Sequence, residues 1–236
     1  MPGFDIAVFS YPDHAHHVAP LIRSIQAHVP GYNQIRIIWD DCNIQQFEFE
    51  DIPVIKHSDW HWSQKLWAHG WIRQQILKLR CHEFSHADYT WVVDSDIRIC
   101  RAFDLFDPDA ELPYLRYQPT PIDADQGCYR FMQQYFGIKS VHDSIIANGG
   151  GNCVFDHEVL HSMDQYCRAH NGGSLTDVLH QLMSQFSDQE LNQWRGYPFS
   201  EFETYGNWVH QNCADRVIPA LPNWSLHNND QDIRVF

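Results

Sequence analysis

The sequence predicts an α/β fold, a Rossmann-like arrangement in which helices flank a mixed, mainly parallel central sheet. Apolar, strand-like segments alternate with helix-like segments over the first hundred residues, an order that gives parallel strands joined by right-handed crossovers. Polar residues directly follow several of these strands, and ligands of parallel sheets bind at the carboxyl ends of strands. With 236 residues and 44% hydrophobic content, we expect one compact domain.

The first strand–helix–strand unit begins with a mostly apolar strand at 4–10, as expected for a buried strand. A helix is predicted at 18–29, and the Pro-Gly pair that follows it is typical of a helix end. The second strand, 33–39, is followed at once by Asp40 and Asp41. These two carboxylates are therefore candidates for the ligand-binding edge of the sheet.

A short third strand at 52–56 precedes a long helix predicted at 63–86. Apolar residues recur along this helix at roughly helical spacing, at Leu66, Ile72, Ile76 and Leu79. The fourth strand, 89–93, consists of bulky residues and ends in the string DSD. Strand and helix thus alternate up to residue 100.

The second half of the chain is less regular. We expect a strand around 112–118, a helix at 126–136, a Gly-rich turn (NGGGN) and a strand at 153–156, followed by two or three helices. The tail, 219–236, is polar, and we expect it to be irregular.

The formal charge of −14, with only 16 Lys and Arg, argues against extensive nucleic-acid binding, which depends on clustered basic residues. An acidic chain is compatible with a site that recruits divalent cations. The seven cysteines, at 42, 81, 100, 128, 153, 167 and 213, form no C-x-x-C pair, so we expect them to be reduced. Neither a signal peptide nor a transmembrane segment is evident, and we expect a cytoplasmic protein.

The string Asp94-Ser95-Asp96 directly follows the apolar strand 89–93. In an extended backbone, residues i and i+2 point to the same side, so the two carboxylates are expected to face one spot. Oxygen ligands of this kind suit Mn²⁺ or Mg²⁺. The same D-x-D pattern occurs at 107–109 and 123–125, but only Asp94 and Asp96 end an apolar strand. We therefore expect a metal site here.

These features resemble the GT-A glycosyltransferases, whose nucleotide-sugar domain opens with a strand, a loop and a helix and carries D-x-D after its fourth strand. The resemblance is closest to an uncharacterised bacterial and phage branch. It is carried by the DSD motif, the first strand and the strings at 70–79 (GWIRQQILKL), 148–156 (NGGGNCVFD) and 199–209 (FSEFETYGNWV). Together these segments span most of the chain in the expected order.

The resemblance implies a metal-dependent transfer of sugar from a nucleotide-diphosphate sugar to a hydroxyl acceptor. Residues 1–100 would form the nucleotide-binding half and 101–236 the acceptor-side half of one GT-A-like domain. A saccharide, a lipid-linked sugar or a small molecule is favoured as the acceptor over a modified phage DNA base, because the chain lacks a basic patch.

Several residues are candidates for binding the nucleotide sugar. Gln74 and Lys78 are spaced i and i+4 on one face of the predicted helix, where an amide and an ammonium group suit phosphate or sugar oxygens, although a solvated face is an equal alternative. The full set of predicted donor-binding residues is Tyr11, Asp40, Asp41, Trp71, Gln74, Gln75, Lys78, Asp94, Asn148, Gly149 and Gly150. The glycines allow close backbone approach to a ligand, or form a simple tight turn.

Glu201 and Glu203 are candidates for the base that deprotonates the acceptor hydroxyl, with Glu201 preferred. Ser200 is positioned to cap a helix, and a capping box accounts for Glu203 without catalysis. By resemblance to enzymes in which a late histidine completes the metal shell, His227 is a third candidate ligand beside Asp94 and Asp96.

The strongest alternative is a zinc metallohydrolase, because His82, Glu83 and His86 match the H-E-x-x-H signature. Against it, no third ligand follows at a short spacing, and the expected helix leaves little room for the site. In a second alternative, a phosphohydrolase, Asp94 acts as nucleophile and Asp96 as acid. A third is a sugar-binding module with a structural cation.

Overall fold

The computed structural model describes most of the chain. The described residues are 2–41, 48–49, 51–62, 69–116, 127–139, 152–187, 199–220, 224–225 and 233–235, with 127–130, 224–225 and 233–235 described by their backbone alone. The fold is α/β, with a five-stranded, mostly parallel mixed sheet flanked by helices, as the sequence predicts.

The main sheet has the strand order β3-β2-β1-β4-β7. Its strands are β1 (Phe4–Ser10), β2 (Tyr32–Trp39), β3 (Val54–Lys56), β4 (Tyr89–Asp94) and β7 (Asn152–Asp156). The first four run parallel, and β7 pairs antiparallel with β4. From β1 the chain first adds β2 and β3 on one side of the strand and then β4 on the other side. Ligands of open α/β sheets bind at the point where the strand order reverses in this way.

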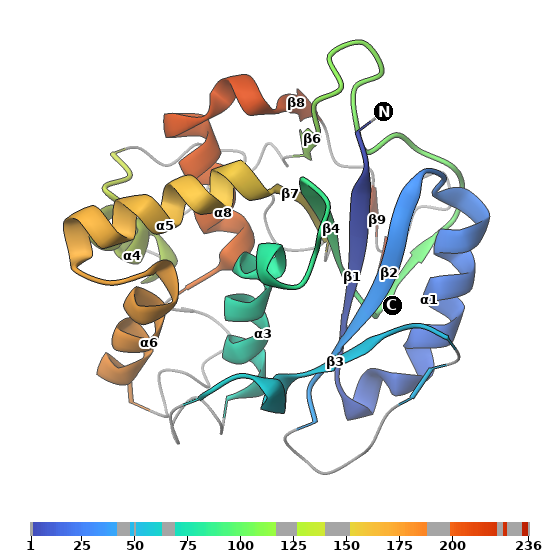
Figure 1. Ribbon diagram of the computed structural model, residues 1–236, viewed down its shortest axis with the longest axis horizontal. Coiled ribbons are helices and arrows are strands. Elements are labelled where there is room, and N and C mark those ends of the chain that lie inside the picture. The colour runs from blue at the N-terminus through green and yellow to red at the C-terminus, as the bar shows by residue number, and fades with distance from the viewer. Residues whose placement is uncertain are drawn as a thin grey trace.

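Helices cover both faces of this sheet (Figure 1). They are α1 (Ala15–His28), α3 (Gly70–Leu79), α4 (Gly127–Phe136), α5 (His157–Asn171), α6 (Leu175–Gln185) and α8 (Glu201–Asn212). Short 3-10 turns lie at η1 (Pro12–His14), η2 (His57–Asp59), η3 (Cys81–Glu83) and η4 (Ala214–Arg216). In Figure 1, α1 lies on one side of the sheet and the other helices lie on the opposite side.

Side chains of β1 alternate between two cores, as expected of a strand buried on both faces. Phe4, Ile6 and Val8 pack with the buried residues of α1. Ala7 and Phe9 point to the other side, where they join the larger core formed with α3, α5, α6 and α8. Burying both faces in this way fixes the position of the strand ends that carry the polar residues.

The helix predicted at 63–86 is shorter than expected. Within the described residues, α3 ends at Leu79 and the 3-10 turn η3 follows. The physical reason is a set of contacts with β1: Ser85 Oγ donates to Asp5 Oδ2 at 2.8 Å, and the His86 backbone N–H donates to the same oxygen at 3.2 Å. A continued helix could not deliver both groups to a buried carboxylate.

The described residues of the tail form strands that its polar sequence does not predict. The tail contributes the short strands β8 (Ile218–Ala220), β9 (Trp224–Ser225) and β10 (Ile233–Val235), which pair with β5 (Ile97–Ile99) and β6 (Tyr114–Arg116) in two small sheets. Strands of two or three residues are too short to show a periodic pattern, so the sequence gives no sign of them. Since β10 pairs with β5, the C-terminal strand lies beside the residues that follow Asp96.

Within the described ranges, no helix combines the length and the apolar character that crossing a bilayer would need.

Candidate functional site

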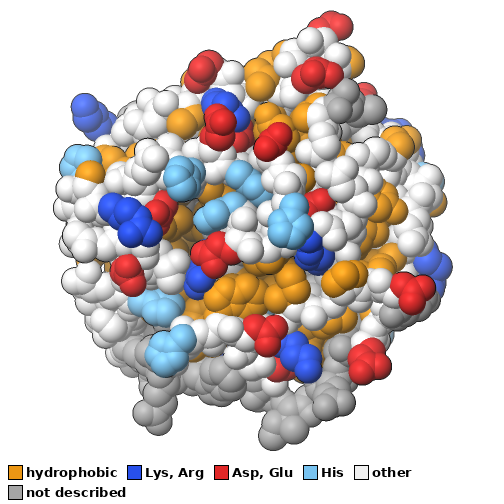
Figure 2. Space-filling view, viewed as in Figure 1, with side chains coloured by type: hydrophobic (Ala, Val, Ile, Leu, Met, Phe, Trp, Pro, Cys, Tyr) orange, Lys and Arg blue, Asp and Glu red, His pale blue; other side chains and the backbone are white. Residues whose placement is uncertain are grey.

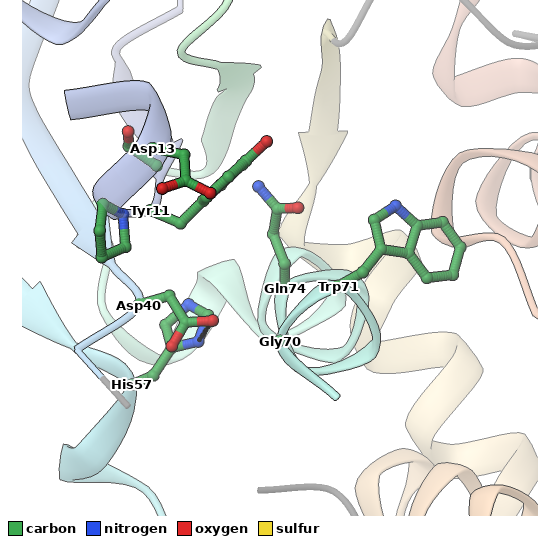
Figure 3. Close-up of a pocket in the computed structure, with 9 residues that line it drawn as sticks. Tyr11, Asp13, Asp40, His57, Gly70, Trp71 and Gln74 are labelled. Carbon is green, nitrogen blue, oxygen red and sulfur yellow. Dashed lines mark ion pairs between the residues drawn. The ribbon is translucent and has the colours of Figure 1, made fainter. Parts of the chain in front are cut away.

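A pocket opens at the carboxyl ends of β1 and β2, facing the N-terminal turn of α3, and has a volume of about 310 Å³. We call it the β1–β2 pocket. Its lining residues are Ser10, Tyr11, Pro12, Asp13, Asp40, His57, Gly70, Trp71 and Gln74. Figure 3 shows residues from β1, η1, β2 and η2 on one side and α3 on the other. The pocket therefore lies at the edge where the sequence predicts ligand binding.

Backbone pairing brings the ends of three strands together at this edge. The Asp40 N–H donates to the Ser10 carbonyl at 3.0 Å, and the Ser95 N–H donates to the Phe9 carbonyl at 3.0 Å. The end of β1 is thus flanked by the end of β2 on one side and by the DSD string that ends β4 on the other. Parallel pairing, rather than any single side chain, assembles the predicted residues.

Asp40 is held by an ion pair with a buried arginine. Both oxygens of its carboxylate lie 2.8 Å from Arg73 Nη2, and only 14% of the Asp40 side chain is exposed. Gly70 packs against this pair: a Cβ added there would lie 2.5 Å from Asp40 Oδ2. A glycine at the start of α3 therefore lets the helix approach Asp40 closely. The carboxylate forms a fixed negative wall of the pocket.

Asp41 has a local structural contact. Its carboxylate accepts hydrogen bonds from the Ser58 backbone N–H at 2.9 Å and from Ser58 Oγ at 2.5 Å. These bonds tie the end of β2 to η2. Asp41 does not line the β1–β2 pocket, so its predicted role in donor binding has no support from the pocket geometry.

Tyr11 forms the rim of the pocket between Asp13 and Gln74. Its ring stacks on His14 with centroids 4.1 Å apart, and its hydroxyl lies 2.6 Å from His14 Nε2. The side chain is 37% exposed, so part of it remains accessible to a ligand. Burial raises the pKa of the Tyr11 hydroxyl first, and the charges of Asp96, Asp13 and Asp94 raise it further. The DSD motif is therefore close enough to this rim to act on it electrostatically.

Two residues of α3 converge on Asp94, as their predicted common helix face implies. Lys78 Nζ lies 2.8 Å from Asp94 Oδ1, and Gln74 Nε2 donates to the same oxygen at 3.4 Å. Since Gln74 also lines the pocket, it links the pocket to the DSD motif. The Asp94 side chain remains 27% exposed, so a ligand can reach part of it.

Lys78 is buried between two carboxylates. Its Nζ atom lies 2.8 Å from Glu201 Oε1 as well as from Asp94 Oδ1, and its side chain is 1% exposed. The Phe202 ring lies below the ammonium, 4.7 Å from ring centroid to Nζ. Burial lowers the pKa of Lys78, but the two carboxylates outweigh it and hold the pKa well above its usual value. Lys78 is therefore charged and fixed in place.

Glu201 and Glu203 lie in the first turn of α8, which Ser200 caps by accepting from the Glu203 N–H. Their exposures are 2% and 6%. Glu201 pairs with Lys78, and the amide of Gln75 faces its carboxylate from α3. A base must reach the acceptor hydroxyl. In the described geometry Glu201 instead holds Lys78, with the Gln75 amide against the Glu201 carboxylate, and neither glutamate is exposed as a base would be.

Asp94 ends β4, but Ser95 and Asp96 form a turn instead of the extended backbone that the sequence predicts. The two carboxylates still offer oxygen atoms of the kind that divalent cations bind. Burial and then the negative charge of Asp94 raise the pKa of Asp96, so the two carboxylates repel each other, and a bound cation would relieve this repulsion. Among the described residues, no group of three or more His, Cys, Asp or Glu side chains is arranged to hold a metal. Two protein carboxylates with further oxygens from a bound diphosphate remain compatible with Mn²⁺ or Mg²⁺.

Other predicted residues lie elsewhere. Asn148, Gly149, Gly150 and His227 lie outside the described residues. Trp71 borders the pocket at its backbone end, but Figure 3 shows its indole directed away from Asp40 and His57. It packs against the larger core instead.

The HEFSH string does not form the helical zinc signature. His82 lies in the 3-10 turn η3, and Glu83 makes a two-point ion pair with Arg80, with both contacts at 2.6 Å. A second H-E-x-x-H string, HEVLH at 157–161, begins α5. Nε2 of His157 binds Thr90 Oγ1 at 2.8 Å. Figure 2 shows histidines gathered on the surface over α5 and the turn before β4.

Two residues of the pocket wall were not predicted. His57 and Ser10 both line the β1–β2 pocket, with exposures of 1% and 2%. Ser10 ends the first strand, so its position beside Asp40 could have been anticipated from the strand alignment. His57 directly follows the predicted strand at 52–56 and so carries a similar signal, and the pairing of β3 with β2 brings it to the pocket.

Comparison with known proteins adds no identification: the sequence matches no protein-family model and no curated protein.

Proposed function

We propose that this chain is a metal-dependent glycosyltransferase that moves a sugar from a nucleotide-diphosphate sugar to a hydroxyl acceptor. One observation carries the proposal: a pocket of about 310 Å³ at the carboxyl ends of β1 and β2 adjoins the Asp94-Ser95-Asp96 motif through Gln74. The pocket suits a nucleoside in size and position, and the acidic pair beside it suits a metal-bound diphosphate. The resemblance to GT-A glycosyltransferases points the same way.

The residues of the chain would act mainly by positioning. Tyr11 presents a partly exposed ring on which a flat base can stack. Lys78 and Gln74 fix one oxygen of Asp94, whose side chain stays partly exposed. When bound at Asp94 and Asp96, a divalent cation would supply the positive charge that stabilises a leaving diphosphate.

The transfer itself is a substitution at the anomeric carbon. The acceptor hydroxyl oxygen forms a bond to that carbon as the bond from the carbon to the diphosphate oxygen breaks. The nucleoside diphosphate leaves with the bonding electron pair, and the hydroxyl proton passes to a base. We assign Glu201 to holding Lys78 rather than to this proton transfer, because it is buried and ion-paired.

A saccharide, a lipid-linked sugar or a small molecule is the proposed class of acceptor, and the cytoplasm the proposed location. The charge of −14 supports this choice of acceptor, since an acidic protein repels a nucleic-acid backbone.

The test is thermal unfolding of the purified chain with Mn²⁺ and a panel of nucleoside diphosphates. A ligand at 100 times its dissociation constant stabilises the native state by about 2.7 kcal/mol, so we expect one or more nucleotides to raise the unfolding midpoint by several degrees. We expect Asp96→Asn to abolish the increase, because it removes the charge that a cation needs. The rise should require the metal.

Asp109→Asn is the matched control, since Asp109 belongs to a D-x-D string but is exposed on a turn outside the pocket. It should respond to nucleotide and metal as the wild type does. A rise that persists in Asp96→Asn would remove the motif from the site. Stabilisation by Zn²⁺ alone, with no response to any nucleotide, would favour the metallohydrolase alternative.

A further inference from the structure

Lys78 divides its charge between a carboxylate of the acidic motif and a carboxylate of another helix. Its Nζ atom lies 2.8 Å from Asp94 Oδ1 and 2.8 Å from Glu201 Oε1. Asp94 ends β4, and Glu201 begins α8, which packs beside α3 (Figure 1). Because the two distances are equal, neither carboxylate has the lysine to itself.

The surroundings of Lys78 make these charge interactions strong. The side chains of Lys78 and Glu201 are 1% and 2% exposed. The ring centroids of Phe9 and Phe202 lie 5.8 Å and 4.7 Å from the ammonium nitrogen. Bulk water is therefore kept away from the pair, and its Coulomb interactions are screened less than they would be at the surface.

The charge of Lys78 acts on both carboxylates of the motif. The ammonium contacts Asp94 directly. Burial is the largest cause that raises the pKa of Asp96, and Asp94 adds to it, whereas Lys78 acts in the opposite direction. A positive charge that stabilises these two carboxylates in the metal-free protein also repels a divalent cation that binds to them. A lysine without a balancing charge would therefore weaken a metal site at Asp94 and Asp96.

We propose that Glu201 sets the affinity of the Asp94–Asp96 site for a divalent cation, because its carboxylate offsets the charge of Lys78. Glu201 acts through Lys78 and is therefore a positioning residue. With the glutamate in place, the lysine holds one oxygen of Asp94 while adding little net positive charge to the site. Because this role requires that the motif binds a metal, it rests on the proposed function.

Equilibrium dialysis of the full chain tests this role, with Mn²⁺ alone and with Mn²⁺ and inorganic pyrophosphate, which supplies phosphate oxygens. We expect Glu201→Gln to weaken Mn²⁺ binding about tenfold, since the amide oxygen still accepts from Lys78 but no longer offsets its charge. Glu201→Asp keeps the charge and should retain more of the affinity than Glu201→Gln. Asp94→Asn should abolish the binding, which shows that the metal measured is bound at the motif.

Glu158→Gln is the matched control. Glu158 also lies in the first turn of a helix and pairs with a cation, Arg216, but its side chain is 77% exposed and belongs to α5. The substitution removes the same charge from the chain at a position outside the motif and its Lys78–Glu201 pair. It should leave the affinity for Mn²⁺ unchanged.

The double variant Lys78→Met/Glu201→Leu separates charge balance from a purely structural role of Glu201. It removes the repelling charge together with the charge that offsets it, so we expect it to bind Mn²⁺ at least as tightly as the wild type. If Glu201 served only to attach α8 to α3, the double variant would bind no better than Glu201→Gln. Unfolding midpoints verify that each variant is folded, and the double variant tests the proposal by itself if Glu201→Gln does not fold.

Unchanged Mn²⁺ affinity in Glu201→Gln, or a double variant that binds more weakly than the wild type, would overturn the role of Glu201 alone. Absence of Mn²⁺ binding to the wild type, both with and without pyrophosphate, would overturn the proposed function together with it. Binding that persists in Asp94→Asn would do the same, because the metal would then lie outside the motif.

Discussion

At Lys78, one ammonium group compensates two carboxylates in the interior. Because Glu201 is 2% exposed, Lys78→Met would leave its charge buried without a partner, and breaking a buried pair in this way costs about 3–5 kcal/mol. We expect Lys78→Met to lower the free energy of unfolding by that amount in urea titrations. The double variant Lys78→Met/Glu201→Leu should recover most of the loss, since neither partner of the pair is then a buried charge.

Asp94→Asn is a useful comparison, because Asp94 is 27% exposed and water can replace part of its interaction with Lys78. It should cost less than Lys78→Met. If Lys78→Met is as stable as the wild type, or if the double variant is less stable than Lys78→Met, then the Lys78–Glu201 pair does not stabilise the fold as its geometry indicates.

Lys78 also shows what the sequence can and cannot predict about a single residue. The i, i+4 spacing of Gln74 and Lys78 correctly implied a common helix face, and Asp94 follows β4 as expected. The spacing says nothing of burial, which arises because α8 packs on α3 and brings Glu201 against Lys78. The sequence therefore places Glu201 near a helix start but cannot show that it is buried against Lys78.

At the scale of single elements, α6 provides a test of local capping. Ser174 and Asp177 form a capping box: Ser174 Oγ accepts from the Asp177 N–H at 3.1 Å, and the Asp177 carboxylate accepts from the Ser174 N–H at 2.9 Å. We expect Ser174→Ala to lower the free energy of unfolding by about 1 kcal/mol, because the freed helix N–H groups lose their partner. Chemical denaturation measures the difference.

Ser184→Ala is the control within the same helix. Ser184 lies near the end of α6 and is exposed, and alanine has the higher helix propensity, so this change should be neutral or slightly stabilising. Equal losses in both variants would mean that the cap contributes no more than an ordinary surface serine.

Elements with a strong local pattern were predictable, and elements that depend on distant contacts were not. The strands at 4–10 and 33–39 and the helix after the first strand lie close to β1, β2 and α1, because continuous apolar runs and a Pro-Gly pair specify them locally. The end of α3 depends on Asp5, a residue some eighty positions earlier whose bonds to the 85–86 segment pull the chain back to β1. The strands of the tail depend on pairing with β5 and β6.

At the scale of the whole molecule, the order of the strands in the sheet determines where a ligand-binding site can form. The alternation of strands and helices, with right-handed crossovers, predicts that neighbouring strands run parallel. The observed order β3-β2-β1-β4 places the ends of β1, β2 and β4 side by side. Sequence reasoning could therefore locate the edge of the sheet. It could not specify the wall of the pocket, since that wall combines residues from β1, β2, η2 and α3.

Several histidines make the stability of the fold depend on pH. Burial is the largest cause that lowers the pKa of a group of described histidines, His17, His57, His82, His157 and His180. These side chains are neutral in the folded protein and take up protons more readily when it unfolds. Their contribution to stability is complete above about pH 6.5 and is lost as the pH falls. For His57 and His157, whose folded pKa is about 4, the loss extends toward pH 4. Asp96 and Glu201, whose pKa values are raised, act in the opposite direction.

We therefore expect the free energy of unfolding to fall steadily between pH 7 and pH 4.5. For His57, a folded pKa of about 4 against 6.5 in the unfolded chain corresponds to a contribution on the order of 3 kcal/mol across the whole interval. Urea titrations at several pH values, followed by tryptophan fluorescence, measure the slope. His57→Gln cannot titrate, so its curve should be shallower than that of the wild type whatever its stability at pH 7. Parallel curves would show that His57 takes up its proton without unfolding, and that the β1–β2 pocket is open enough to solvate an imidazolium.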